Sequence, residues 1–157
     1  MDIQNILATS LPLIVALILG AIVGIERNMA GRPAGMRTYA LVSMGSALFI
    51  IISNSFGHIT GMQPIDALRV TPNILVGIGF IGAGLVFLQD NKVTGLTSAA
   101  GLWVSAAIGS ACGFELYPLA IIATILTLAI FSVLWIIEDK FLLKKVHYSS
   151  KNDELKK

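Results

Sequence analysis

Five long stretches of the sequence contain no charged side chain, and these stretches constrain the fold more than any other feature. A helix needs about 20 apolar residues to cross a hydrocarbon core of about 30 Å, and every stretch reaches that length. In lipid each backbone polar group must find its partner within the chain, so the stretches are expected to form α-helices. They are Ile3–Ile25, Thr38–Ile65, Val70–Gln89, Val93–Phe114 and Leu116–Ile137.

The resulting prediction is an all-α membrane protein, a compact bundle of five transmembrane helices. Residues 1–137 form the five-span transmembrane domain, and residues 138–157 form a short basic cytoplasmic tail. The second stretch is longer than one span, so it is expected to contain a loop near Gly57–Pro64. The first stretch is expected to be a retained helix, because a signal peptide carries positive charge before its apolar segment, and only Asp2 precedes this one.

Composition excludes several classes of protein. Hydrophobic residues make up 55% of the chain and charged residues 13%, against about a quarter charged in soluble domains. Soluble enzyme domains, disordered chains and nucleic-acid-binding proteins do not have this composition. The single cysteine, Cys112, cannot form an intramolecular disulfide. Because no catalytic constellation is recognisable, neither an enzyme nor a cofactor is expected, and magnesium is the one ion left open.

The distribution of basic residues predicts the orientation of the bundle, because cytoplasmic loops carry an excess of lysine and arginine. If the N-terminus lies outside, ten of the 11 basic residues fall in inner segments and only Arg69 falls outside. An odd number of spans then places the C-terminus in the cytoplasm. The inner residues are Arg27, Arg32, Arg37, Lys92, Lys140, Lys144, Lys145, Lys151, Lys156 and Lys157.

Small residues predict which helices pack closely, because helix association in lipid depends on close approach of the backbones. From Thr97 to Gly113, 13 of 17 residues are glycine, alanine, serine, threonine or cysteine, so the fourth span is expected to be surrounded by protein. The third span is expected to pack in the same way, with a hinge as the alternative, and the fifth is expected to face lipid. The glycines assigned to helix packing are Gly77, Gly79, Gly82, Gly84, Gly101 and Gly109.

One segment of the third span imitates a nucleotide-binding motif. The residues from Gly77 to Gly82 match the pattern G-x-G-x-x-G. That pattern binds a dinucleotide when it follows a strand and when an acidic residue comes about 20 positions later. Here it lies within a membrane-length apolar stretch, where the backbone amides are committed to a helix, so nucleotide binding is excluded.

Charged residues at the ends of the spans have two competing interpretations. Ionisable groups at membrane depth are costly and usually functional, whereas at the interface they serve as topology signals. The topology interpretation is favoured for Arg27, Arg32 and Lys92. For four other residues both interpretations stay open, namely Glu26, Arg37, Asp66 and Arg69.

A magnesium cage built from the carboxylates of one chain is not expected. Magnesium prefers octahedral oxygen ligands and keeps several waters. With the predicted orientation, Glu26 and Asp90 lie at the inner face, and Asp66 and Glu115 lie at the outer face. The two pairs are therefore separated by about the thickness of the membrane.

Three further segments form an ordered pattern along most of the chain. The first joins Gly24-Ile25-Glu26-Arg27 to the segment 32–38, the second joins Asp66-x-x-Arg69 to the segment 77–84, and the third is the segment 95–109. In order and spacing, from about Gly20 to Ile130, they resemble the signatures of the MgtC/SapB (YhiD-like) family of bacterial inner-membrane proteins.

The resemblance implies a multi-pass protein of the bacterial inner membrane, linked to magnesium limitation, acid stress or survival within macrophages. Some members of that family inhibit the F-type ATP synthase. The implied partners are therefore the lipid bilayer, a membrane protein such as the F-type ATP synthase, and a second copy of the chain, with no nucleic acid. The resemblance also implies a polar contact site at Glu26, Arg37, Asp66, Arg69 and Thr97.

The chain departs from the family pattern in three respects. Thr94 stands where the family often has a basic residue, and Thr71-Pro72-Asn73 stands where Ala-Ala-Gln is common. The chain also resembles the short, membrane-only type, which lacks the soluble ACT-like domain of some members. An activity that resides in that domain is therefore not transferred to this chain.

Two classes of function follow from these observations. The first is a non-catalytic regulatory protein that acts through helix–helix interaction, and span centres without charged groups favour it. The second is a small oligomeric transporter or channel for magnesium or protons, and the glycine-rich third and fourth spans favour that alternative.

Overall fold

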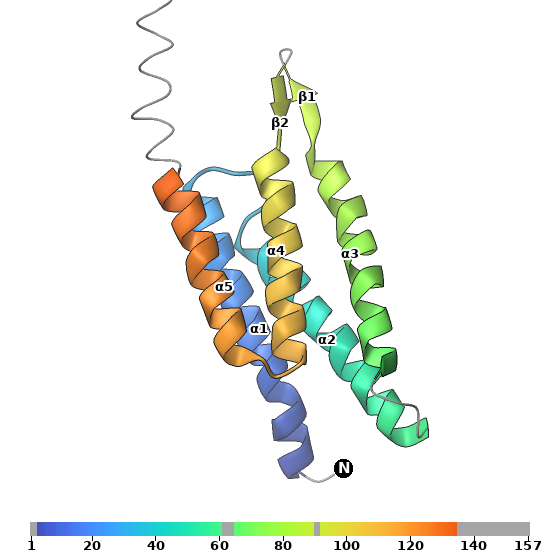
Figure 1. Cartoon of the computed structure of the whole chain (residues 1–157). Coiled ribbons are helices and arrows are strands. Elements are labelled where there is room, and N and C mark those ends of the chain that lie inside the picture. Colours follow the sequence, from blue (N-terminus) through green and yellow to red (C-terminus); the bar gives the residue numbers. More distant parts are fainter. Residues whose placement is uncertain (1–2, 61–64, 90–91, 135–157) are drawn as a thin grey trace, which may run out of the picture.

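A computed structural model of the chain describes residues 3–60, 65–89 and 92–134. Within these ranges the chain forms five α-helices and one short β-hairpin (Figure 1). A π-helical turn at Ile130–Leu134 continues the last helix. The elements are α1 (Ile3–Met29), α2 (Met36–Thr60), α3 (Ile65–Leu85), β1 (Phe87–Gln89), β2 (Lys92–Thr94), α4 (Leu96–Gly113) and α5 (Tyr117–Ala129).

Four of these helices have the length and apolar composition needed to cross a membrane. They are α1, α2, α4, and α5 together with its π-helical continuation. In α3 the apolar segment Val70–Leu85 is shorter than a full span. The predicted bundle of five helices is therefore confirmed, with four candidate spans among the described residues. A fifth span and the sidedness of the bundle stay predictions.

Successive helices run in opposite directions, so their ends gather at two opposite ends of the bundle (Figure 1). One end holds the last turn of α1, the first turn of α2, the β-hairpin, the first turn of α4 and the π-helical turn after α5. This end is termed the hairpin end below. It is the end for which the basic residues predict a cytoplasmic location.

Helix α4 is the central helix of the bundle. It packs against α1, α2, α3 and α5, and half of its residues are buried. Helix α5 is peripheral, because only 22% of its span is buried and Ile122, Ile125 and Leu126 are exposed. The expectations of a surrounded fourth span and an outward-facing fifth span are both confirmed.

Glycines allow α1, α2 and α4 to approach each other closely. A Cβ atom at Gly109 of α4 would lie 1.9 Å from the carbonyl oxygen of Ser43 in α2, so no side chain fits there. A Cβ atom at Gly20 of α1 would lie 2.7 Å from the Cβ atom of the same serine. The three backbones therefore meet around Ser43, in the kind of contact that small residues permit in lipid.

Three glycines of α3 do not contact another described helix of the same chain, so their assignment to helix packing stays a prediction. A Cβ atom at Gly77, Gly79 or Gly84 would meet no described atom within 4 Å. The reason is the rotation of α3 about its axis. Ile74 and Ile78 point into the core, Gly77 borders an apolar groove beside α2, and Gly79 and Gly84 have open space around them. Gly82 lies on the inner side of α3, where its Cβ would make an ordinary contact of 3.4 Å with Ala99.

The β-hairpin between α3 and α4 was not predicted, because β1 lies within the third charge-free stretch and β2, apart from Lys92, lies within the fourth. Its strands pair antiparallel, with Phe87 opposite Thr94 and Leu88 opposite Val93. The Thr94 hydroxyl donates a hydrogen bond of 3.2 Å to the Phe87 carbonyl oxygen. An apolar stretch can thus contain an interfacial strand as well as a helix, and its length overstates the length of the span.

Gly95 explains why α4 begins where it does. Its φ of +86° lies in the left-handed region, which favours glycine. A Cβ atom at this position would also lie 1.9 Å from the carbonyl oxygen of Leu85, the last residue of α3. Gly95 therefore holds the base of the hairpin against the end of α3.

Several predictions fall wholly or partly outside the described residues. The loop expected near Gly57–Pro64 begins later than predicted, because α2 continues to Thr60, and residues 61–64 are not described. The side chains of Asp66 and Arg69 are also not described, and neither is the tail at residues 138–157.

The glycine contacts predict opposite outcomes for two alanine substitutions. Gly109→Ala should separate α2 from α4 and destabilise the bundle by about 1–3 kcal/mol, the usual cost of overpacking. Gly79→Ala faces open space and should be neutral or slightly stabilising, because alanine favours helix by up to about 1 kcal/mol over glycine. Reversible unfolding by SDS in mixed micelles, followed by circular dichroism, measures both. Equal destabilisation by the two substitutions would contradict the assignment of the packed and open faces.

Candidate functional site

The last turn of α1 buries an arginine at the hairpin end of the bundle. Arg27 is 3% exposed, although the charge-free stretch that ends two residues before it was expected to reach the interface. The burial of Arg27 gives it a structural role within the bundle, and its interpretation as a topology signal stays a prediction. A buried guanidinium is costly unless it is paired and hydrogen-bonded, so its neighbours define the candidate site.

Two groups compensate the charge of Arg27. Its Nε and Nη2 atoms donate to the two carboxylate oxygens of Glu26, and the Nη2–Oε1 distance is 2.6 Å. On the other side the guanidinium carbon lies 3.7 Å from the ring centroid of Phe131. Such a cation–π contact contributes about 0.5–2 kcal/mol, depending on how far it is removed from water. The arginine therefore connects the end of α1 to the segment that follows α5.

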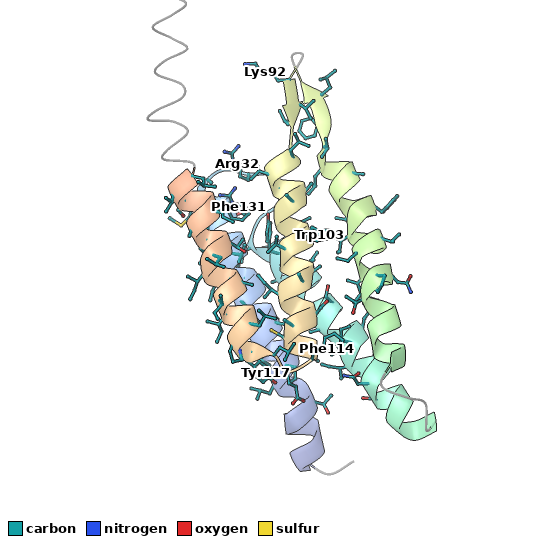
Figure 2. All side chains as sticks on the ribbon, in the orientation of Figure 1. Arg32, Lys92, Trp103, Phe114, Tyr117 and Phe131 are labelled. Carbon is teal, nitrogen blue, oxygen red and sulfur yellow. The ribbon has the colours of Figure 1, made fainter. Side chains whose placement is uncertain are left out.

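The π-helical turn at Ile130–Leu134 places Phe131 in this contact. Turns of this kind within α-helices are rare and occur frequently at functional sites. Phe131 is 7% exposed, whereas Ile130 and Val133 on either side are more than half exposed. The altered backbone thus continues the outward-facing helix α5 while one aromatic ring turns into the bundle (Figure 2).

Tyr39 joins the site from the second turn of α2. It is fully buried, so its polar groups need hydrogen-bond partners within the bundle. Its hydroxyl donates to the Ser98 carbonyl oxygen at 3.2 Å, and its carbonyl oxygen accepts a hydrogen bond of 2.9 Å from the Ser105 hydroxyl. Both bonds cross to α4, so Tyr39 fixes the register between α2 and α4.

Gly101 of α4 provides the space in which the two aromatic side chains meet. A Cβ atom at Gly101 would lie 2.2 Å from the Tyr39 hydroxyl oxygen and 2.7 Å from Cζ of Phe131. These contacts unite α1, α2, α4 and the turn after α5 in one arrangement. It is termed the Arg27 cluster below and consists of Glu26, Arg27, Tyr39, Ser98, Gly101 and Phe131.

The structure brings only part of the predicted polar site together. Glu26 belongs to the Arg27 cluster and is partly buried. Arg37 and Thr97 lie in the first turns of α2 and α4, at the same end of the bundle, and both are exposed. The side chains of Asp66 and Arg69 lie outside the described residues.

Sequence reasoning missed four members of the cluster, namely Arg27, Tyr39, Ser98 and Phe131. A signal for Arg27 was present, because its acidic neighbour Glu26 adds little to a topology signal and is better explained as a charge partner. No comparable signal marked Phe131, which lies 104 positions further along the chain. Only the folded structure shows that Phe131 contacts Arg27.

The Arg27 cluster does not fit a magnesium site. Both carboxylate oxygens of Glu26 are engaged by the guanidinium of Arg27, and magnesium needs oxygen ligands in octahedral geometry. Among the described residues, no three His, Cys, Asp or Glu side chains form a group that could hold a metal ion. The geometry suits a neutral internal brace between helices.

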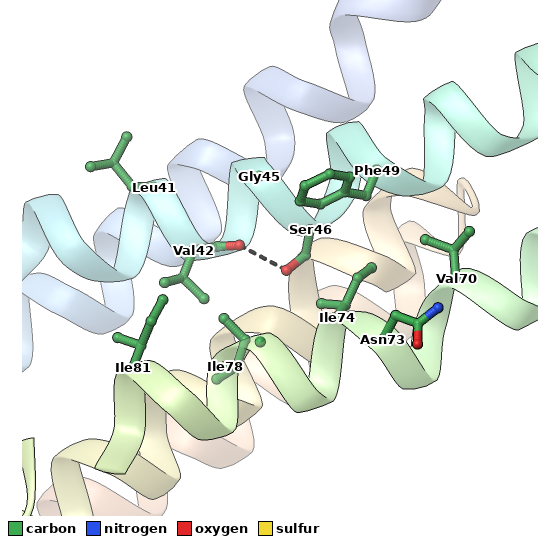
Figure 3. A pocket seen from close by; sticks show the side chains of 11 residues that line it. Leu41, Val42, Gly45, Ser46, Phe49, Val70, Asn73, Ile74, Ile78 and Ile81 are labelled. Atoms are coloured by element: carbon green, nitrogen blue, oxygen red, sulfur yellow. Dashed lines mark hydrogen bonds between the residues drawn. The ribbon is translucent and has the colours of Figure 1, made fainter. Parts of the chain in front are cut away.

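A second feature is an apolar groove between α2 and α3, with a volume of about 490 Å³ (Figure 3). Gly45 of α2 and Gly77 of α3 lie in its walls, together with Phe49 and Ile78. The Ser46 hydroxyl in the groove is engaged, because it donates to the Val42 carbonyl oxygen at 2.8 Å. The groove therefore offers shape and apolar surface, with few polar groups to orient a ligand.

These features define a small polytopic α-helical membrane protein with a buried charge pair near one end of the bundle. The sequence profile of the MgtC family matches residues 13–140, and the chain belongs to the MgtC family.

Three relatives illustrate the relationship. The chain is 38% identical over 141 residues to "Putative magnesium transporter YhiD" of Escherichia coli K12, covering 85% of this chain and 66% of the relative. It is 40% identical over 131 residues to "Protein SrpB" of Synechococcus elongatus, covering 78% and 72%. It is 42% identical over 118 residues to "Protein MgtC" of Salmonella typhimurium, covering 75% and 48%. The match thus spans between about half and three quarters of these relatives, and no solved structure matches the chain significantly.

The Arg27 cluster predicts that two nearby arginines differ sharply in importance. Arg27→Met should leave the Glu26 carboxylate without its partner and destabilise the bundle by about 1–3 kcal/mol. This is below the cost for a fully buried pair, because Glu26 keeps contact with solvent. Arg32→Met is the control, since Arg32 is exposed in the loop between α1 and α2, and it should change stability by less than about 0.5 kcal/mol. SDS unfolding in mixed micelles measures both, and an equal response of the two variants would contradict the structural role of Arg27.

Proposed function

We propose that this chain is a non-catalytic regulatory protein of the bacterial inner membrane. It acts in magnesium homeostasis and in the response to acid or low-magnesium stress, through helix–helix interaction with other membrane proteins. The link to magnesium is supported by membership of the MgtC family and by the printed name of the YhiD relative. The mode of action is supported by the open face of α3.

The open face of α3 is the observation that carries the proposal. Val76 is 75% and Phe80 is 85% exposed, and Gly79 and Gly84, on the two sides of this surface, have no described atom within reach of an added Cβ. Small residues have little value on a surface that faces only lipid tails, but they allow a second helix to approach closely. We therefore assign this face to a partner helix.

The rest of the bundle supports such a role because it is braced internally. The Arg27 cluster ties α1, α2, α4 and the turn after α5 together at the hairpin end. Helix α3 packs against α2 and α4 alone among the main contacts, so its opposite side is available. A rigid support with one available helix face suits a protein that binds other membrane proteins.

The F-type ATP synthase is the partner that the family resemblance suggests, and a second copy of this chain is the other. A bulky side chain on the open face should weaken binding of the partner without destabilising the bundle. Gly79→Leu adds a bulky side chain there, and we expect it to weaken inhibition of ATP-driven proton pumping by about tenfold, which corresponds to about 1.4 kcal/mol. Acridine-dye fluorescence in inverted membrane vesicles measures the pumping.

The matched control for this test is Ala129→Leu. Ala129 is exposed on α5, so the change places leucine on a different outward face and should leave any effect on pumping unchanged. If the wild-type chain has no effect on pumping, the ATP synthase is not the partner. If both leucine variants behave like the wild type, the open face of α3 is not the contact surface.

The alternative function is a small oligomeric transporter or channel for magnesium or protons. The name of the YhiD relative favours it, and the groove between α2 and α3 is the specific structural observation in its support. Oligomerisation along α3 would enclose that groove and could complete a path that one chain does not contain.

Ion flux in proteoliposomes distinguishes the two functions. We expect the purified chain to give magnesium and proton fluxes equal to those of empty liposomes, measured with a magnesium-sensitive and a pH-sensitive dye inside the vesicles. Flux above that background that is lost in Asp66→Asn would overturn the regulatory proposal and support transport. Asp66→Glu, which keeps the charge, is the control for loss of folding.

A further inference from the structure

The β-hairpin at the end of the bundle carries an exposed apolar face. Leu88 and Val93 lie opposite each other in the register, and side chains of directly opposed residues share one face of a hairpin. Leu88 is 68% and Val93 is 55% exposed, and Leu96 at the start of α4 is 59% exposed. In water such a surface would be unfavourable for so small a hairpin, because two strands alone are marginally stable.

The position of the hairpin explains this exposure. Strand β2 leads through Gly95 directly into α4, which is one of the candidate spans. Three strand residues extend about 10 Å, and the headgroup layer on each side of a bilayer is about 5–8 Å thick. If α4 spans the bilayer, this geometry would place the strands at the depth of the lipid headgroups and their boundary with the acyl chains.

The hairpin is also held firmly at its base. The left-handed conformation of Gly95 and its close contact with the Leu85 carbonyl oxygen fix the direction in which the strands leave the helices. The hydrogen bond from the Thr94 hydroxyl to the Phe87 carbonyl oxygen fixes their pairing. The apolar pair is thus presented at a defined depth.

The charge at this end of the bundle complements anionic lipid. Lys92 begins β2, and Arg32 lies in the loop between α1 and α2 at the same end (Figure 2). Both are exposed, as is Arg37 in the first turn of α2. Among the acids whose side chains the structure describes, Glu26 is the one at this end of the bundle, and it is already engaged by Arg27. The exposed charge of the described residues at this end is therefore positive.

We propose that the hairpin is a lipid-binding element that contacts anionic phospholipid. Leu88 and Val93 insert at the boundary between headgroups and acyl chains, and Lys92 contacts a lipid phosphate. A basic residue near an anionic membrane surface contributes a favourable interaction that salt weakens. The contact anchors the connection between α3 and α4 to the membrane surface.

A depth measurement tests the apolar part of the proposal. Cys112 is buried and is the single cysteine, so Cys112→Ala provides a background in which Val93→Cys carries one bimane probe. The full chain is reconstituted in vesicles of phosphatidylcholine and phosphatidylglycerol. We expect shallow nitroxide lipids to quench this probe more than deep ones, and iodide on both sides to quench it weakly.

A probe at Ile125→Cys, which is 60% exposed in the middle of the peripheral helix α5, is the reference for the hydrocarbon core and should respond more to the deep nitroxide. Strong iodide quenching at position 93 would show that the hairpin lies in water and would overturn the proposal. Protection of the probe from both iodide and lipid nitroxides would show that a protein covers the hairpin, and this result would overturn it as well.

A charge measurement tests the phosphate contact. With the nitroxide carried by phosphatidylglycerol or by phosphatidylcholine, we expect about a fivefold preference for the anionic lipid at position 93. Lys92→Gln should abolish most of this preference, Lys92→Arg should retain it, and about 1 M salt should reduce it, because the Debye length then falls to about 3 Å. A preference that is unchanged in Lys92→Gln would overturn the assignment of Lys92.

Discussion

The burial of one guanidinium group determines how the hairpin end of this bundle is built. A charge that is removed from water must be neutralised and must keep its hydrogen bonds. Arg27 obtains both from the bidentate carboxylate of Glu26, and the ring of Phe131 covers its face. Because Phe131 follows α5, this single requirement fixes the position of the last described segment against the first helix. The Tyr39 ring and the bare backbone at Gly101 then complete the packing around Phe131.

The glycines divide the molecule into two parts with different tasks. In α1, α2 and α4 they allow backbone contacts so close that a methyl group does not fit, as at Gly109. In α3 the same residue type faces open space at three positions. Hydrophobicity does not drive association between helices in lipid, so packing and polar contacts must hold them. Helices α1, α2 and α4 make such contacts within the chain. Helix α3 leaves part of its surface available for such contacts with another helix.

The sequence predicted the helices well because the requirement for an apolar span is local. Each charge-free stretch could be compared with the thickness of the membrane without knowledge of its neighbours. The Arg27 cluster could not be predicted in the same way, since Arg27 and Phe131 meet only after four helices have packed. The contacts of the α3 glycines could not be predicted for a related reason, because composition does not reveal how a helix is rotated about its axis. The hairpin was missed because most of its strand residues lie within the charge-free stretches that were assigned to spans.

Both candidate functions lead to the same helix. A regulatory protein needs an available surface, and α3 has one at Val76 and Phe80. A transporter needs helices that can change their spacing, and α3 lines the groove that separates it from α2. The Arg27 cluster is unsuited to either task, because moving its members would expose a buried charge pair to an apolar environment. The two functions therefore differ in what occupies the space beside α3, a partner helix in one case and an ion path formed with further copies in the other.

The short connection through the hairpin limits how far α3 can move from α4, since Gly95 holds it against Leu85. Motion of α3 would accordingly be greatest at the end of the bundle opposite the hairpin, where Asp66 and Arg69 lie in the first turns of that helix.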